Sequence, residues 1–360
     1  MSLLPLAKVT NSLGSVRSAD SQTASAEPRT VDSRSTWHRD LAAAIRCPKK
    51  LLAALDLTPQ DVPELSDDAT TRFELLVPLS FMRRMEAGNP ADPLLQQVLP
   101  VNAEMRAVDG FLVDAVGDEQ ARQAPGLLRK YHGRALLIAA GSCAVHCRYC
   151  FRRSYPYADE PRRLEDWEPA LRQLAADPAI AEVILSGGDP LMLPDVRLGQ
   201  LIERIDAIGH VDRIRIHTRL PIVLPSRIHD DLLAMLTSTR AQVIVVVHAN
   251  HANELQSDCR EAVRQMVSSG LPLLNQAVLL QGINDSVEKL EALSNALVNM
   301  GVMPYYLHQL DRVAGTAHFE VDVETGRSLI AELRRRLPGY AVPRFVQEVA
   351  GHSSKTPLSP

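Results

Sequence analysis

The segment CAVHCRYCFRR, residues 143–153, places three thiols close together in the chain. Cys143, Cys147 and Cys150 are spaced four and three positions apart and are three of the five cysteines in the sequence. Structural zinc takes four protein ligands, commonly as two separated pairs, whereas Cys47 and Cys259 lie far from the segment and from each other. Three thiolates can instead hold a four-iron cluster that leaves one iron open for a small molecule. The spacing therefore favours a catalytic iron–sulfur site.

Three other interpretations of this segment stay open at this point. His146 could complete a zinc site with the three cysteines. The segment could also carry a catalytic thiol beside a histidine, although that chemistry needs only one cysteine. A chance group of buried cysteines is disfavoured because Gly141 and Ser142 indicate a loop, and because Arg148, Arg152 and Arg153 make that loop polar.

The composition is that of a globular protein, with 46% hydrophobic and 23% charged residues. No apolar run approaches the roughly 18–20 residues that cross a bilayer, so we expect no membrane association. The net charge of −4, from 39 basic and 43 acidic residues, gives no basic face for direct nucleic-acid binding. An odd number of cysteines, three of them clustered, fits the reducing cytoplasm better than a secreted disulfide framework. Residues 1–35 lack a secretory core and are expected to be a disordered tail.

The rest of the chain divides by its texture into three parts. Residues 36–125 predict a helical N-terminal region, with a short helix after Ser35 or Thr36 that Pro48 ends and another helix near 109–117. Residues 126–345 alternate apolar, β-branched runs with amphipathic segments near 165–176, 195–208, 228–238, 253–269, 286–300 and 324–336. The runs are RALLIAA, AEVILSGGDP, RIRIHTRLP, QVIVVVHAN, LPLLNQAVLL and MPYYLHQLD. Residues 346–360 form a C-terminal segment after a final strand.

Alternation of this kind predicts parallel βαβ units, and the fold class we expect is α/β: a partial (βα)6-type TIM barrel with an N-terminal helical extension. Function in such barrels sits at the carboxyl ends of the strands. The polar groups GSC, SGGDP, HTR, HANH, NQ and HQLD all follow predicted strands. We therefore expect one site at this end of the barrel.

The pattern CxxxCxxC after the first strand of a parallel barrel resembles the radical S-adenosylmethionine superfamily. SGGDP supports the resemblance, since Ser186, Gly187, Gly188 and Asp189 end the second strand, where glycines allow backbone to approach a ligand closely. The resemblance implies a [4Fe-4S] cluster on the three cysteines. It also implies S-adenosyl-L-methionine bound to the open iron and contacted by these four residues.

A more specific resemblance extends from about Pro78 to the C-terminus. RKYHGRALLIAAGSC, LSGGDPL, RLPIVLPSRI, HANHANE, NQAVLLQGIND, MPYYLHQLD and GHSSKTPL look like the lysine 2,3-aminomutases, in the same order along the chain. The chain has six lysines, and Lys355 would otherwise be read as a lysine of a frayed tail. In that family the lysine of the terminal KTP motif is catalytic and carries pyridoxal 5′-phosphate, which implies Lys355.

The same resemblance assigns the remaining site residues. Lys130, Tyr131 and Arg134 would hold the phosphate, with Lys130 in place of an arginine of the clostridial enzymes. His248 and Gln276 would contact S-adenosylmethionine. For the substrate, Arg152 would bind the carboxylate of free L-lysine, and Asp311 and Glu348 would bind its distal ammonium.

Two features resemble the short branch of the family, which supplies β-lysine for the modification of elongation factor P. Glu348 replaces a clostridial aspartate, and the printed sequence ends five residues after Lys355 without further cysteines. The implied partners are an elongation factor P lysine ligase that takes the product and an unidentified electron donor, and the N-terminal helices are a candidate surface for homo-oligomerisation. The alternatives are an aminomutase for another amino acid, a radical enzyme without pyridoxal phosphate that modifies RNA or protein, and a zinc-stabilised binding module.

Overall fold

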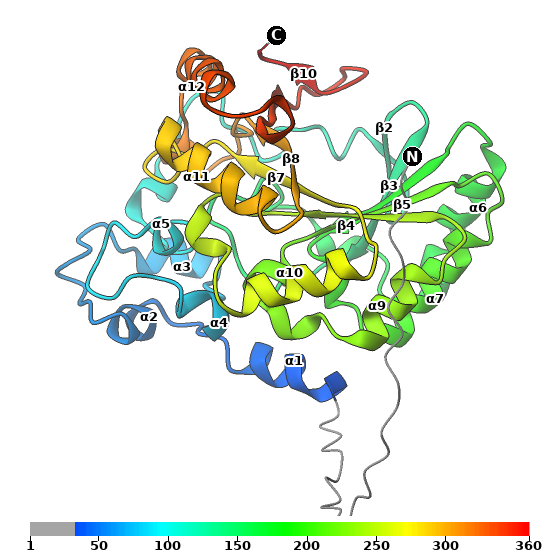
Figure 1. Cartoon of the computed structure of the whole chain (residues 1–360), viewed down its shortest axis with the longest axis horizontal. Coiled ribbons are helices and arrows are strands. Elements are labelled where there is room, and N and C mark those ends of the chain that lie inside the picture. Colours follow the sequence, from blue (N-terminus) through cyan, green and yellow to red (C-terminus); the bar gives the residue numbers. More distant parts are fainter. Residues whose placement is uncertain (1–32, 360) are drawn as a thin grey trace, which may run out of the picture.

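The computed structural model describes residues 33–359, and most of the expected N-terminal tail lies outside this range. Five short helices precede the barrel in this range; the last four lie together on one side of it, and the first lies along its lower edge (Figure 1). They are α1 (Ser33–Ala42), α2 (Pro48–Ala54), α3 (Asp67–Arg72), α4 (Leu79–Met82) and α5 (Pro93–Gln96). Within the described residues, no helix combines the length and apolar character that a membrane crossing needs.

Two details of this N-terminal region were predicted wrongly. Pro48 begins α2, a position that suits its missing N–H, and α1 ends earlier because the chain at Ile45 leaves the helix and pairs with Val77. The expected helix near 109–117 is absent from the structure. Gly110 and Gly117 both have positive φ angles there, and Leu112 forms an isolated bridge to Val313.

A ten-stranded sheet forms the body of the molecule, with its strands in chain order. The strands are β1 (Arg122–Ala124), β2 (Leu127–Tyr131), β3 (Arg134–Ala140), β4 (Glu182–Gly187), β5 (Arg213–Thr218), β6 (Gln242–Val247), β7 (Leu273–Val278), β8 (Met303–His308), β9 (Arg344–Gln347) and β10 (Thr356–Pro357). Pairing is parallel from β3 through β9, which confirms the partial parallel barrel.

Antiparallel strands extend both edges of the parallel sheet, and the sequence did not predict them. β1 and β2 form a hairpin whose second strand pairs with β3. β10 folds back onto β9, with Thr356 opposite Gln347. Lys130 lies within β2 and Lys355 lies directly before β10, so the sheet holds the segments that carry both lysines.

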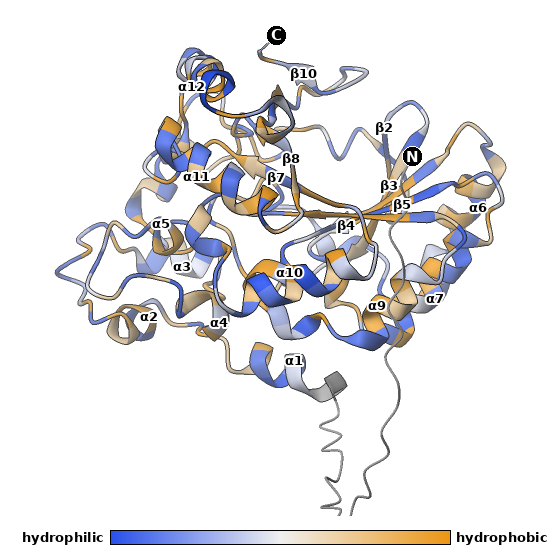
Figure 2. Ribbon diagram, in the orientation of Figure 1, coloured by the Kyte–Doolittle hydropathy of each residue, from blue (hydrophilic) through white to orange (hydrophobic). Residues whose placement is uncertain are grey.

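Helices cover the outer face of the sheet, as Figure 1 shows. They are α6 (Glu168–Ala176), α7 (Asp195–Asp206), α8 (Leu220–Val223), α9 (Asp230–Thr237), α10 (Asp258–Ser268), α11 (Val287–Val298) and α12 (Val323–Arg336). Their inner faces bury leucine, isoleucine and valine against outward-facing strand residues such as Ile214, Ile216 and Val245. Hydrophobic colour accordingly follows the strands, while the helices alternate between hydrophobic and hydrophilic faces (Figure 2).

The inward face of the sheet is more polar than a barrel core. β5 alternates buried Ile214 and Ile216 with half-buried Arg215 and His217. Because side chains of a strand alternate between its two faces, the second pair points into the barrel, where both residues line a cavity. The barrel interior is therefore hollow and lined with hydrogen-bonding groups.

Candidate functional site

The three cysteines lie in the loop that follows β3, and backbone hydrogen bonds hold this loop from two sides. On the barrel side, the N–H of Asp189 donates to the carbonyl of Ser142 at 2.8 Å. On the side of the N-terminal region, the N–H of His146 donates to Leu76 at 3.1 Å and that of Arg148 donates to Gln97 at 2.9 Å. Segments between and after the N-terminal helices therefore hold the cysteine loop against the barrel.

The thiols are half-buried and unbridged. Burial, with the neighbouring thiols acting in the same direction, raises the pKa of Cys143 well above its usual value and that of Cys150 to about 11. Since metals bind the thiolate, cluster assembly here must release protons. Within residues 33–359, no three histidine, cysteine or acidic side chains converge on one metal position. A four-iron cluster does not need such convergence, because each thiolate binds a different iron.

His146 was the candidate fourth ligand of a zinc site. Its Nδ1 lies 2.8 Å from the carbonyl oxygen of Glu74. Its ring stacks on Phe73, with 5.1 Å between the ring centroids. The side chain is therefore engaged with the N-terminal region.

The double glycine after β4 brings two backbones together. Gly187 has φ +110°, and a Cβ on Gly188 would lie 2.4 Å from the carbonyl oxygen of Ser142. The amide of Gly188 donates to Ala140 at 2.7 Å. We expected the glycines to let the backbone approach a ligand closely, and the structure shows that they let it approach the cysteine loop. Both glycines also line the cavity.

Asp189 connects the ends of β4 and β5. Its buried carboxylate accepts hydrogen bonds from the amides of Leu191 and Arg219 and from the hydroxyl of Thr218 at 2.7–3.0 Å. Burial raises the pKa of this carboxyl to about 6, with the three donors acting in the opposite direction. Asp189 is therefore placed to hold the two strand ends in register beside the cysteines.

Asp118 joins two of the expected ligand-binding cations and was missed by the sequence reading. It lies 2.7 Å from the Nε of Arg152 and 2.7 Å from the Nζ of Lys130. Burial opposes ionisation of Asp118, but the two cations outweigh it and lower its pKa. A second nitrogen of Arg152 donates to the hydroxyl of Ser186 at 3.2 Å. The guanidinium of Arg152 is thus fixed at the wall of the cavity.

Lys355 points into the barrel and is not a frayed tail lysine. Its Nζ lies 2.6 Å from Oε2 of Glu348 and 5.9 Å from the ring centroid of Tyr306. Tyr131 donates its hydroxyl proton to the other oxygen of Glu348 at 2.5 Å. The guanidinium of Arg134 stacks on the ring of Tyr131 at 4.6 Å. Lys355 and two of the expected phosphate ligands, Tyr131 and Arg134, thus meet at one wall.

Asp311 lies beyond the end of β8 and faces the same space. Burial raises the pKa of this carboxyl to about 7, while Lys355 acts in the opposite direction and Glu348 reinforces the rise. The pKa of Glu348 is lowered, because its ion pair with Lys355 outweighs burial. Two acids with unequal proton affinity therefore lie beside one ammonium group.

Three imidazoles line the barrel interior. The Nε2 of His248 lies 2.8 Å from the hydroxyl of Tyr149, and burial lowers the pKa of this histidine to about 3. Gln276 donates to Nδ1 of His217 at 3.4 Å, and Nε2 of His217 is buried without a hydrogen-bond partner. Burial also lowers the pKa of His217 and of His308. All three rings are neutral at physiological pH, and His217 presents a free nitrogen to a ligand.

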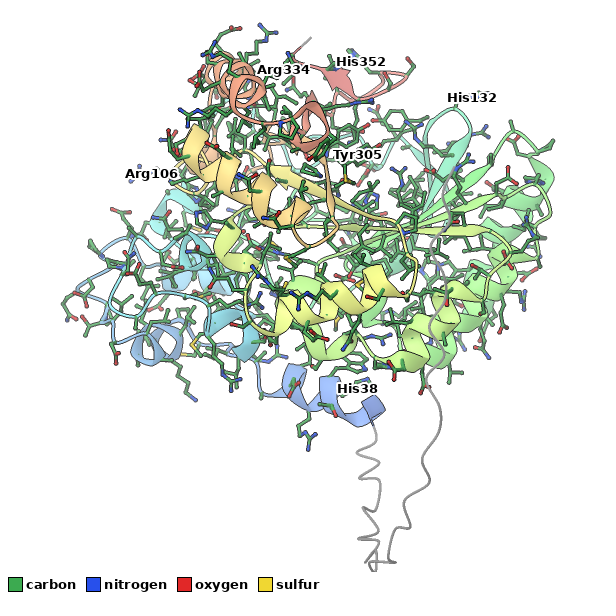
Figure 3. The ribbon with its side chains drawn as sticks, in the orientation of Figure 1. His38, Arg106, His132, Tyr305, Arg334 and His352 are labelled. Carbon is green, nitrogen blue, oxygen red and sulfur yellow. The ribbon has the colours of Figure 1, made fainter. Side chains whose placement is uncertain are left out.

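One cavity of about 560 Å³ unites these groups. Its walls include every residue that the sequence predicted for the site: Cys143, Cys147, Cys150, Lys130, Tyr131, Arg134, Arg152, Ser186, Gly187, Gly188, Asp189, His248, Gln276, Asp311, Glu348 and Lys355. Figure 3 labels Tyr305, another lining residue, and His352, which lies just before Lys355, in the upper part of the view. A volume in this range suits small organic ligands.

Sequence reasoning missed Asp118, Arg215, His217, Arg219 and His308, which also line the cavity. His217, Arg219 and His308 do fall at strand ends, in the HTR and HQLD groups, so the rule used for the other residues could have found them. Asp118 lies in an irregular segment without a motif, and only tertiary structure brings it to Arg152.

Comparison with known proteins agrees with this geometry. Residues 137–293 match the family model described as the radical SAM superfamily. The chain is 46% identical to the L-lysine 2,3-aminomutase of Escherichia coli K12 over 326 residues, which are 91% of this chain and 95% of that protein. The corresponding identity is 43% for the Haemophilus influenzae protein of the same name, over 89% and 94% of the two chains. The Clostridium subterminale L-lysine 2,3-aminomutase is 32% identical, over 90% and 78%.

A solved structure, Streptococcus suis SuiB bound to its precursor peptide SuiA, is 16% identical and gives a TM-score of 0.46 over 62% of this chain and 50% of that one. The relatives named above are matched along most of the chain, and the radical SAM family model includes the loop with the three cysteines. On this similarity the chain belongs to the L-lysine 2,3-aminomutase family of radical S-adenosylmethionine isomerases.

Proposed function

We propose that this protein is an isomerase that converts free L-lysine to β-lysine by moving the α-amino group to the neighbouring carbon. The observation that carries the proposal is the placement of Lys355, which lies 2.6 Å from Glu348 in the cavity that the three cysteines line. A lysine amine and a set of three thiols in one enclosed space suit two cofactors that react together. The family relationship supplies the reaction class.

The residues present fit the three cofactors of the proposal. Cys143, Cys147 and Cys150 would hold a [4Fe-4S] cluster, and His248 and Gln276 would contact S-adenosylmethionine beside it. Lys355 would carry pyridoxal 5′-phosphate covalently, with its phosphate against Lys130, Tyr131 and Arg134. When bound, the cluster and S-adenosylmethionine supply a carbon radical that removes a hydrogen atom, and pyridoxal phosphate supplies the group that carries nitrogen between carbons.

The chain's own contribution is to position lysine at both ends. The guanidinium of Arg152, held by Asp118 and Ser186, would bind the substrate carboxylate through its remaining donors. Asp311 and Glu348 would bind the distal ammonium. Because fixed geometry supplies a large part of rate enhancement, anchoring both ends limits hydrogen removal to one carbon.

Two acids at the far end favour lysine over other amino acids. A neutral or acidic side chain would leave Asp311 and Glu348 without a counter-charge in a partly buried place, and an unpaired buried charge is costly. The two acids therefore disfavour the alternative of an aminomutase for another amino acid. The amine of Lys355 in the same cavity as the cysteines, with Lys130 and Arg134 available for a phosphate, disfavours a radical enzyme without pyridoxal phosphate.

We place this activity in the cytoplasm, as the source of β-lysine for a ligase that attaches it to elongation factor P. The support is the 46% identity to the Escherichia coli relative and the glutamate at position 348. The reaction also needs a one-electron donor. Mass spectrometry of elongation factor P from cells with and without this gene tests the assignment. Loss of a mass increment equal to one lysine residue supports it, and unchanged modification overturns it.

The activity itself is tested with anaerobically reconstituted protein. The incubation contains L-lysine, S-adenosylmethionine, pyridoxal phosphate and dithionite, and chiral chromatography resolves the product. β-Lysine formation that depends on all four additions supports the proposal. Protein that holds iron, sulfide and pyridoxal phosphate yet leaves lysine unchanged while converting another amino acid overturns it, and zinc in place of iron would favour a binding module.

A further inference from the structure

Arg219 reaches the cysteine loop from the end of β5. Its Nη1 donates a hydrogen bond to the sulfur of Cys147 at 2.7 Å. Its backbone N–H donates to Asp189 at 2.7 Å, which fixes the main chain at the start of α8. We propose that Arg219 sets the reduction potential of the iron–sulfur cluster, through this bond to a cluster ligand and through its positive charge. The inference rests on the cluster assigned in the proposed function and adds a role that neither the cysteine motif nor the lysine site requires.

The guanidinium is fixed by groups on its other side. Nη2 of Arg219 donates to Glu254 at 2.8 Å and to Gln97 at 2.7 Å. The rings of Phe81 and Tyr149 lie 5.3 and 5.8 Å from its central carbon. These contacts hold Nη2, whereas Nε of Arg219 is buried without a hydrogen-bond partner and Nη1 donates to Cys147.

Glu254 is itself held rigidly and carries a buried negative charge. It is fully buried, and its Oε1 accepts from the amides of Asn250 at 2.9 Å and His251 at 3.1 Å and from the side chain of Gln97 at 3.0 Å. The unit beside the sulfur is therefore a buried ion pair, with its positive end against the cysteine. Removing the arginine makes the local charge more negative by one unit, and removing the glutamate makes it more positive by one unit.

Charge and hydrogen bonding at the sulfurs are among the factors that set the potential of such clusters. Reduction adds one negative charge to a centre that already carries three thiolates. A nearby cation lowers the energy of the reduced state more than that of the oxidised state, and burial weakens the screening by water. Arg219 is 7% exposed. We therefore infer that it raises the potential and makes the first electron transfer easier.

Other arginines near the loop are committed elsewhere. Arg148 is bonded to Glu104 and to the carbonyl oxygens of Phe73 and Ala69. Arg153 shares Glu104 and bonds to Gly315. Arg219 differs from both, because its Nη2 is held by the buried Glu254 while its Nη1 donates to a thiol.

The test is a potentiometric titration of the reconstituted cluster, followed by electron paramagnetic resonance in the presence of redox mediators. Arg219→Gln removes the charge, and Glu254→Gln removes the opposing charge. Arg227→Gln is the matched control, because Arg227 is also buried and paired with an acid, Asp195, but donates to the carbonyls of Leu191 and Leu193. Iron and sulfide content, measured on each protein, reports cluster loading.

We expect the midpoint potential to become more negative in Arg219→Gln and more positive in Glu254→Gln, each by more than in Arg227→Gln. General loosening of the fold cannot produce shifts of opposite sign. Potentials in both variants that match the control overturn the inference and leave the aminomutase assignment intact. If Arg219→Gln does not retain a cluster, Glu254→Gln tests the inference by itself. A more positive midpoint potential supports the inference, and an unchanged or more negative one overturns it. Wild-type protein that holds no iron and sulfide would overturn the proposed function and this inference with it.

Discussion

Lys355 and Glu348 face each other across the turn between β9 and β10, with 2.6 Å between Nζ and Oε2. The two residues are seven positions apart, and the antiparallel pairing of Thr356 with Gln347 brings them together. Glu348 is therefore positioned to bind an ammonium group at this wall, and in the structure that group is the ammonium of Lys355. In the proposed reaction Glu348 would also bind the distal ammonium of the substrate.

Lys355→Ala should abolish covalent attachment of pyridoxal phosphate, because the side chain that enters the cavity is then lost. Borohydride reduction followed by peptide mass spectrometry measures the attachment directly. We expect label on Lys355 in the wild type and none in the variant. Lys289→Ala is the control, since Lys289 bonds to Gly282 and Asp285 on the surface and should leave the label unchanged. Label on a different lysine in the wild type would contradict the assignment.

Glu348→Gln should weaken lysine binding while the fold persists. Hydrogen bonds to charged groups contribute about 1.5–3 kcal/mol, so we expect the KM for lysine to rise roughly 10- to 100-fold, with a smaller effect on kcat. Glu348→Asp keeps the charge and should recover part of the loss. Equal KM values in the wild type and Glu348→Gln would show that this carboxylate does not bind the substrate.

Lysine binding should weaken as the pH falls through about 7, because the pKa of Asp311 is raised to about 7 by burial. Above that pH the carboxylate is charged and pairs with the distal ammonium, whereas below it binding must first release a proton. The KM for lysine should therefore rise towards acid, and Asp311→Asn should give a raised KM with a flatter pH profile. Asp109→Asn, on the exposed surface, should retain the wild-type profile. An unchanged profile in Asp311→Asn would assign the titration to another group.

The parallel core could be predicted from the sequence because each of its strands is a short β-branched or leucine-rich run followed by an amphipathic helix. The runs at 134–140 and 242–247 are clear examples, and both form strands over those residues. The edges could not be predicted in the same way. β2 contains Arg129, Lys130 and Tyr131, and β10 is two residues long, so neither carries a periodic apolar signal. Their pairing depends on neighbours already in place.

The site could be predicted where residues follow strands or belong to a motif. Cys143 belongs to the cysteine motif, and His248 and Asp311 lie in the strand-end groups HANH and HQLD, although only the family resemblance gave these two residues a role. Asp118 has no local signal, and its importance comes from pairing with Arg152, 34 positions away. Arg219 was part of the predicted HTR group, but its bond to Cys147 depends on the buried Glu254 of a different loop. Long-range ion pairs of this kind leave little trace in a single sequence.

Gly188→Ala should reduce iron–sulfur cluster content, because the new Cβ would lie 2.4 Å from the carbonyl oxygen of Ser142. Backbone cannot move away as a flexible side chain does, so the cysteine loop must shift relative to β4 and separate the three thiols from their common geometry. Iron and sulfide analysis after anaerobic reconstitution measures the loss, and circular dichroism reports whether the barrel remains folded.

Gly209→Ala is the matched control, since a Cβ there meets nothing within 4 Å. It should retain wild-type cluster content. Attachment of pyridoxal phosphate depends on the far wall of the cavity, where Lys355 lies. Folded Gly188→Ala protein should therefore still attach the cofactor to Lys355. Full cluster content in Gly188→Ala would show that the loop tolerates displacement and that the double glycine serves the ligand alone. Loss of both cofactors would instead indicate that the substitution unfolds the barrel mouth as a whole.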